Sequence, residues 1–375
     1  MRSAISSVGK VLWHMPGRFE LTRCAGPSYS LRCVVFHNIS DEQSPFTAGI
    51  GVTITPNKFE AALRFLTAHY VPVCLQDVLT NCEGRGLPLR AILVTFDDAY
   101  ASVAEWAAPL CQKFGVPVVF FVNAAFLNNQ RLAPDNLVCY VANTMGMETI
   151  NAAIRAVQGP EAIQAHSLAD VFGRFFPASS LVERDAFLDA LRQLTGINES
   201  AMAKEACLYL TSNQLLDLRS FDFEIGNHTY THPHCRSLSQ SDFASEVDKN
   251  KAELESLSGT KIRSFSIPYG SSKDLTQELV QHLERTGHQA VFLSESVSNS
   301  RQANRFHLDR ISTSAESDDS LFLEIEVLPR LRAIRNRLFG NSVSLHTDRL
   351  QPLADRERPI NSNVEVRTVD RRQRA

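Results

Sequence analysis

Two continuous apolar runs, separated by one helix-like stretch, are the feature that most constrains the fold. The runs are RAILVTFDD (90–98) and VPVVFFVNAAF (116–126), and between them lies an amphipathic segment over 99–115 that ends at Gly115. A strand that is apolar on both faces has to be covered on both faces. This pattern is typical of a parallel sheet with helices packed on it, and it predicts an α/β fold.

The same alternation of strand and helix continues on both sides of this pair. The segments predicted as strands are 31–39, 221–232, 262–270, 288–294 and, as a short strand or loop, 307–312. The segments predicted as helices are 54–70, 242–259, 274–287 and 320–340. A repeated strand–helix unit of this kind favours one large α/β domain.

Residues of about 127–210 interrupt the alternation, because they have helical periodicity and no paired His or carboxylates in a ligand-like motif. We expect a helical insertion that packs beside the α/β domain, outside the metal site. The predicted organisation is an N-terminal extension (1–30), the α/β domain (31–315), a C-terminal helix (316–340) and a polar tail of disorder-typical composition (341–375).

The composition excludes several classes of protein. Lys and Arg number 38 against 41 Asp and Glu, so the net charge of -3 argues against a general nucleic-acid-binding protein. No run approaches the roughly 18 apolar residues of a membrane span. The first 21 residues lack the apolar core of a secretory signal, and the eight Cys form no CxxC pair, so we expect a cytoplasmic protein.

Asp97 and Asp98 follow directly after the predicted strand 90–98. Loops at the carboxyl ends of parallel strands build active sites in α/β proteins. Adjacent carboxylates point in different directions, so one can bind a cation while the other stays free as a base. The structural alternative is that one of them caps the following helix.

His228 and His232 stand four residues apart in NHTYTH. On a helix or tight turn this spacing brings both imidazoles to one side, where they can bind one ion. The alternative is a pair of surface His in a chain that has eleven. One Asp and two His would make three protein ligands and leave positions open for water and substrate, which is the arrangement of a catalytic metal.

Taken together and in this order, TFDD (95–98), the HTxxH pattern at His228 and His232, and PYG (268–270) resemble the polysaccharide deacetylase family, also called the NodB-homology or family 4 carbohydrate esterase group. The resemblance covers about 31–126 and 210–315. It implies a distorted (β/α)7-type barrel carrying the helical insertion, and hydrolysis of acetyl groups on N-acetylated sugars. The implied partner is therefore an N-acetylated glycan.

Carried over to this sequence, the resemblance implies that Asp98, His228 and His232 bind a divalent metal, usually zinc. It implies that Asp97 is the general base and that the backbone N–H of Tyr269 stabilises the oxyanion. Substrate contacts are expected from Pro268, Tyr269 and Arg310.

The proton donor is expected at His37, at the carboxyl end of the first strand. The chain is similar to a circularly permuted subgroup of bacterial exopolysaccharide deacetylases in which this strand comes first. A core His bonded to a backbone carbonyl is the alternative, and His346 fits the usual C-terminal motif only loosely.

Two positions depart from the family pattern. Ala99 replaces the usual Gly after the two Asp, and Ser266 stands where many members have an Arg that orients the catalytic Asp. Arg310 is the candidate substitute for that Arg.

The expected function is therefore a metal-dependent hydrolase that removes acetyl groups from N-acetylated sugars of a poly- or oligosaccharide or its precursor. The alternatives are a metal-dependent amidohydrolase that acts on a small amide and a catalytically impaired glycan-binding member of the family.

Overall fold

The structure is a computed structural model that describes residues 11–24, 29–81, 86–221, 223–297, 299–300 and 304–339. The predicted tail (341–375), with His346, lies outside the described residues, as do residues 1–10 and 25–28 of the N-terminal extension. None of the described helices is long and apolar enough to cross a bilayer.

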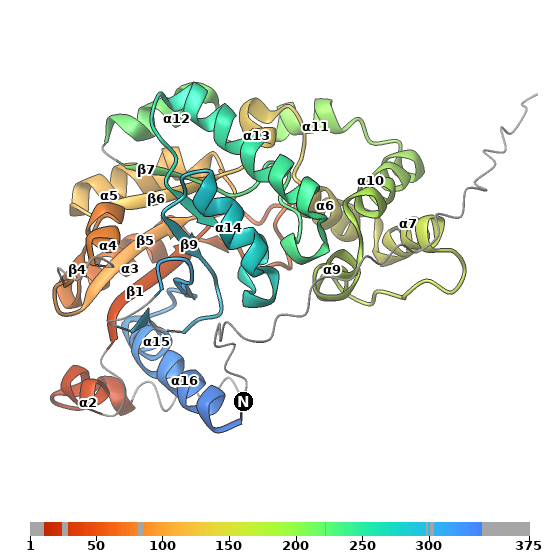
Figure 1. Cartoon of the computed structure of the whole chain (residues 1–375). Helices are drawn as coiled ribbons and strands as arrows, with labels where there is room; N and C mark the ends of the chain where they lie inside the picture. Colours follow the sequence, from red (N-terminus) through yellow and green to blue (C-terminus); the bar gives the residue numbers. More distant parts are fainter. Residues whose placement is uncertain are drawn as a thin grey trace, which may run out of the picture. The chain divides into compact units, whose positions relative to one another are not determined.

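A curled, mainly parallel sheet forms the centre of the molecule (Figure 1). Its main strands are ordered β1–β5–β6–β7–β8–β9, and each is parallel to its neighbours. Their bounds are Tyr29–Phe36 (β1), Ala91–Phe96 (β5), Val118–Val122 (β6), Glu224–Asn227 (β7), Ser264–Ser266 (β8) and Ala290–Phe292 (β9). Every residue of β5 and β6 is buried, which agrees with the continuous apolar runs of the sequence.

The sheet closes on itself through the segment 308–312. Leu308 pairs in parallel with Phe292 of β9, and Ile311, in β11 (Ile311–Ser312), pairs in parallel with Val34 of β1. This seventh strand position joins the last strand to the first, so β1 has a neighbour on both sides. The distorted (β/α)7-type barrel predicted from the sequence is confirmed.

Helices on the outside of the barrel cover the sheet (Figure 1). The covering helices are Pro56–His69 (α3), Leu75–Asn81 (α4), Ala108–Phe114 (α5), Ser212–Ser220 (α12), Gln240–Ser258 (α13) and Gln277–Arg285 (α14). Short elements complete the fold: Arg18–Cys24 (α2), Asn38–Ile39 (β2), Thr53–Ile54 (β3), Val71–Pro72 (β4) and Asn299–Ser300 (β10). Thr55 caps α3 and Gly115 ends α5 in the left-handed conformation.

The segment between β6 and β7 is helical, as the sequence predicts, and its helices lie together beside the barrel (Figure 1). They are Pro134–Met145 (α6), Met147–Gln158 (α7), Leu168–Asp170 (α8), Phe176–Ala178 (α9), Leu181–Thr195 (α10) and Glu199–Ala206 (α11). They surround a hydrophobic core of their own that includes Phe175, Phe176 and Phe187. We call residues 127–210 the insertion.

The C-terminal helices Asp318–Phe322 (α15) and Leu328–Phe339 (α16) are joined by one further helical turn that carries Glu326. Glu326 is buried, and its two oxygens accept hydrogen bonds from Arg32 of β1 at 2.9 and 3.0 Å. Leaving either of two buried charges alone is costly, so this pair anchors the C-terminal helices to the barrel.

Candidate active site

The predicted site residues meet at the carboxyl ends of the barrel strands. They border a cavity of about 540 Å³, within the size range of small-molecule sites. Its lining includes His37 after β1, Asp97 and Asp98 after β5, and His228 and His232 after β7. Residues that are 60 to 200 positions apart in the chain are thus brought together because parallel strands end at the same edge of the sheet.

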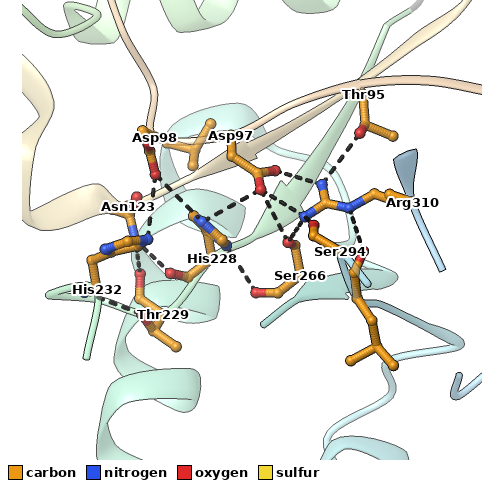
Figure 2. Close-up of polar contacts among 12 residues, drawn as sticks. Thr95, Asp97, Asp98, Asn123, His228, Thr229, His232, Ser266, Ser294 and Arg310 are labelled. Carbon is orange, nitrogen blue, oxygen red and sulfur yellow. Dashed lines mark hydrogen bonds and ion pairs between the residues drawn. The ribbon is translucent and has the colours of Figure 1, made fainter. Parts of the chain in front are cut away.

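Asp98, His228 and His232 converge on one point (Figure 2). Oδ1 of Asp98 lies 3.4 Å from Nε2 of each histidine, and the potential ligand atoms all lie within 4.8 Å of one another. The other ring nitrogen of each His is already used. Nδ1 of His228 donates to the carbonyl of Ser266 at 2.8 Å, and Nδ1 of His232 donates to Asp135 at 2.7 Å. Both Nε2 atoms are therefore left as ligands, and this donor set fits a divalent ion of the zinc type.

The backbone around this point has an unusual conformation. Asp98, Ala99, His232 and Tyr269 have φ values of 72°, 56°, 56° and 60°, in the left-handed region that side chains disfavour. Such conformations persist where the surrounding structure enforces them, and they are frequent at active sites. The turn thus keeps a glycine-like conformation at Ala99, which explains why a Gly is usual there. This side chain is buried at 3% exposure.

The guanidinium of Arg310 forms an ion pair with the carboxylate of Asp97 (Figure 2). The guanidinium donates from Nη1 to Oδ1 and from Nη2 to Oδ2, each at 2.7 Å, and Arg310 has no exposed surface. Its remaining donors reach Leu293 O, Thr95 Oγ1, Ser266 Oγ and Ser294 Oγ. A bidentate pair of this kind fixes the carboxylate plane.

The position of Arg310 explains why Ser266 can replace the usual Arg. It also corrects the expectation that Arg310 contacts the substrate. Ser266 is small enough to leave room for the guanidinium that Arg310 brings from the closing segment, so the orienting Arg is present but comes from another strand. Because Arg310 is fully buried and does not border the cavity, it is not placed to touch a substrate.

The three residues of the PYG segment (268–270) do not all border the cavity. Tyr269 and Gly270 border the cavity, whereas Pro268 is buried and is absent from its lining, so a substrate contact from Pro268 is not supported. The Tyr269 ring stacks on His234 with centroids 3.7 Å apart, and its hydroxyl donates to Asp135 at 2.6 Å. The oxyanion role of its backbone N–H stays a prediction.

The candidate ligand group in the described residues contains no side chain of the insertion, but the insertion borders the cavity and contacts the site. Asp135, in the first turn of α6, accepts from His232 with one oxygen and from Tyr269 with the other. It thereby fixes which nitrogen of His232 carries the proton, which is the usual role of a carboxylate behind a metal-ligating His. The sequence offered no signal for this role, because an Asp in the first turn of a helix is common for reasons of the helix dipole alone.

His37 borders the same cavity as Asp97, Asp98 and His228, at the end of β1. Burial lowers the pKa of His37, and the nearby Asp98 and Asp97 carboxylates only partly oppose this effect. The resting imidazole is therefore neutral at pH 7, and a donor role requires that it first receive a proton. His307, another His near the closing segment, does not border the cavity, and its Nε2 lies 4.0 Å from Oδ2 of Asp309.

The carboxylates of the site are charged at neutral pH. Burial alone would raise the pKa of Asp97, but the guanidinium of Arg310 and the imidazole of His228 bring it below its ordinary value. Burial likewise opposes the charge on Asp98, whose pKa is held well below the usual range by His232 and His228. Asp97 is thus ionised and able to accept a proton, although Arg310 makes it a weaker base.

Comparison with known proteins agrees with this geometry. The sequence profile of the family described as polysaccharide deacetylase matches residues 85–291, more than half of the chain, including Asp97, Asp98, His228, His232 and Tyr269. This chain belongs to the polysaccharide deacetylase family. It is thereby a hydrolase of carbon–nitrogen bonds other than peptide bonds, in a family whose members are generally metal-dependent and act on glycans. A comparison with curated protein sequences finds no match.

The solved structures with a similar fold include deacetylases. The deacetylase PplD of Streptococcus pyogenes, in complex with acetate, has a TM-score of 0.52 at 14% identity over 80% of this chain and 99% of its own. IcaB of Ammonifex degensii has a TM-score of 0.52 at 17% identity over 80% and 98%. A de-N-acetylase of Aggregatibacter actinomycetemcomitans has a TM-score of 0.50 at 15% identity over 76% and 96%. At these identities the likeness concerns the fold of the deacetylase barrel.

Proposed function

We propose that the chain is a metal-dependent deacetylase that removes acetyl groups from the N-acetylated sugars of a poly- or oligosaccharide or its precursor. The observation that carries this proposal is the convergence of Asp98 with the Nε2 atoms of His228 and His232, each at 3.4 Å, beside the separate carboxylate of Asp97. Structural zinc sites are closed by four protein ligands, whereas three ligands at the edge of a cavity leave room for substrate.

The residues of the site would divide the reaction between them. A divalent ion, most simply zinc, would polarise the amide carbonyl and make a water acidic when bound by Asp98, His228 and His232. Asp97 accepts the proton of the attacking water, with its plane fixed by Arg310. The backbone N–H of Tyr269 is proposed to donate to the oxyanion. His37 is proposed to pass a proton to the departing sugar amine.

Acetate release tests the proposal. Purified protein is stripped with a chelator, reloaded with Zn²⁺, and incubated with short N-acetylglucosamine oligomers, a sugar nucleotide and acetylated xylan. We expect acetate only from the reloaded protein and about one ion per chain by elemental analysis, because one three-ligand site binds one ion. Loss of the ion in His232→Ala is expected as well.

Two results would contradict the proposal. One is a stoichiometric ion retained by the double variant His228→Ala with His232→Ala. The other is equal acetate release before and after removal of the ion. The cytoplasmic location stays a separate prediction, tested by fractionation of cells that express the full chain.

A further inference from the structure

The insertion is attached along both of its edges to loops that surround the cavity. On one edge, Asn143 of α6 donates to the carbonyls of Pro45 at 3.1 Å and Ala48 at 3.0 Å. These two residues lie between β2 and β3, in residues 40–52, which we call the loop after β1. Asn136 donates to the carbonyl of Phe46 at 2.9 Å. The insertion and this loop are therefore joined by several hydrogen bonds to backbone carbonyls, which hold both partners in register.

Apolar contacts close the same edge. The rings of Phe46 and Tyr140 stack with centroids 4.9 Å apart. Leu168 lies so close to Gly49 that a methyl group there would come within 3.1 Å of it. Since this space is already filled, a sugar chain has no room to pass between the insertion and the loop after β1.

The other edge of the insertion is attached to the loops after β7 and β8. Arg184 of α10 donates to the carbonyl and the hydroxyl of Thr231 at 3.1 and 2.9 Å. His234 donates to the carbonyl of Phe172 at 3.1 Å, and Asp135 binds both His232 and Tyr269.

The strand order shows what these contacts enclose. Along the barrel, β1, β5, β6, β7 and β8 are successive neighbours. The insertion follows β6 and is joined to the loops after β1 on one side and after β7 and β8 on the other. It therefore walls the cavity over this whole arc. The rest of the rim, from β9 to β1, carries the small side chains of Ser294, Ser312 and Thr313, and Ser312 is exposed.

A second cavity of about 470 Å³ adjoins this remaining arc. It shares Gly49, Gly51, Ile54 and Thr313 with the catalytic cavity and lies between the loop after β1 and the residues after β11. Its lining is rich in hydroxyl and charged groups: Ser40, Asp41, Glu42, Gln43, Ser44, Thr47, Thr53, Thr55, Lys58, Ser314 and Glu316. Hydroxyls and amides, which both donate and accept, and carboxylates, which accept, suit the hydroxyl groups of a sugar.

From these observations we propose that the enzyme acts on the end of a glycan. The terminal N-acetylated sugar occupies the walled catalytic cavity, and the sugars that follow it lie in the second cavity. The inference rests on the proposed deacetylase function and adds a one-sided binding mode to it. Internal sugars of a long chain are excluded, because a chain would have to continue through the wall formed by the insertion.

Product mapping on a defined probe tests this binding mode. The Zn²⁺-loaded full chain is incubated with the β-1,4-linked hexamer and dimer of N-acetylglucosamine, and tandem mass spectrometry locates the first sugar that loses its acetyl group. We expect that sugar to be terminal in the hexamer. First deacetylation spread over internal sugars would overturn the inference while leaving the proposed function intact. No acetate from either oligomer, the sugar nucleotide or acetylated xylan would overturn the proposed function and the inference with it.

Two variants probe the wall and the second cavity separately. Asn143→Ala, at an exposed position outside both cavities, removes the hydrogen bonds to Pro45 and Ala48, and we expect internal sugars of the hexamer to become substrates. Gln43→Trp fills the second cavity and should lower the ratio of kcat/KM for the hexamer to that for the dimer about tenfold, the effect of one lost contact to sugar.

Gln193→Trp on the exposed face of α10 is the matched control for the added ring, and thermal unfolding of all variants checks their folding. A ratio that is unchanged in Gln43→Trp, or a terminal preference that is unchanged in Asn143→Ala, would count against the second cavity and the wall respectively.

Discussion

The barrel and the insertion contribute to the same cavity in different ways. The barrel supplies the groups that would do chemistry, Asp97, Asp98, His228 and His232, and all of them lie at strand ends. The insertion supplies Asp135, which contacts two of the barrel's site residues from behind. The difference teaches that reactive groups come from the rigid scaffold here, whereas their orientation and the shape of the cavity come from a segment with its own core.

The largest expected effect is the loss of turnover when a carboxylate of the barrel is replaced. We expect Asp97→Asn to lower kcat by about 10² to 10⁴-fold, because Asn has the shape of Asp and no base. The ion should remain bound, whereas Asp98→Asn, its neighbour, should lose it. Acetate release and elemental analysis of both variants make the test. Near wild-type turnover in Asp97→Asn would show that Asp97 only pairs with Arg310.

The next effect concerns the stability of the insertion. Phe187 has no exposed surface, and its ring lies 4.9 and 5.8 Å from those of Phe175 and Phe176. We expect Phe187→Ala to lower the free energy of unfolding by about 3 to 5 kcal/mol, through lost burial and a residual cavity. Chemical denaturation of the wild type and of Phe187→Ala measures this difference in the free energy of unfolding.

Val182→Ala on the same helix is the control, since Val182 is 79% exposed and should change the free energy of unfolding by less than about 0.5 kcal/mol. Equal stability of the two variants would mean that the insertion has no core of its own.

A smaller effect should connect the two regions. We expect Asp135→Asn to weaken Zn²⁺ binding by about 10 to 100-fold, because the amide holds His232 and Tyr269 less firmly than the carboxylate does. Competition with a chelating dye measures the affinity without using activity. Asp189→Asn, an exposed acid of the same insertion, is the control. Unchanged affinity in Asp135→Asn would separate the insertion from the ion site.

The smallest expected effect is a pH-dependent change in the free energy of unfolding, caused by an acid of the barrel. Burial, together with the nearby Glu295, raises the pKa of Asp309 from 3.8 to about 7. The folded state therefore binds the proton more tightly than the unfolded chain does. This contribution to stability is complete below the unfolded pKa and is lost as the pH rises through about 7.

Asp309→Asn keeps the shape of the protonated acid, so we expect its free energy of unfolding to fall less than that of the wild type between about pH 5 and pH 8. Urea titrations at several pH values, with Asp41→Asn at an exposed position as the control, measure the difference. Parallel pH profiles for the wild type and Asp309→Asn would contradict it.

Much of the barrel chemistry was predictable because it is encoded locally. The apolar runs that form β5 and β6 are continuous, so they indicate buried parallel strands by themselves. Asp97 and Asp98 directly follow such a strand, and His228 and His232 share one short loop. A few residues of sequence therefore specify both the type of group and its place at the strand ends.

Only the tertiary structure decided what these groups contact. Arg310 reaches Asp97 because the segment 308–312 closes the barrel beside β1, a pairing that no local pattern reveals. Asp135 reaches His232 across 97 positions of the chain because α6 packs against the loop after β7. Hydrogen bonds and ion pairs need atoms within about 3 Å of each other, and for segments this far apart the packing of the helices and the closure of the sheet set that distance.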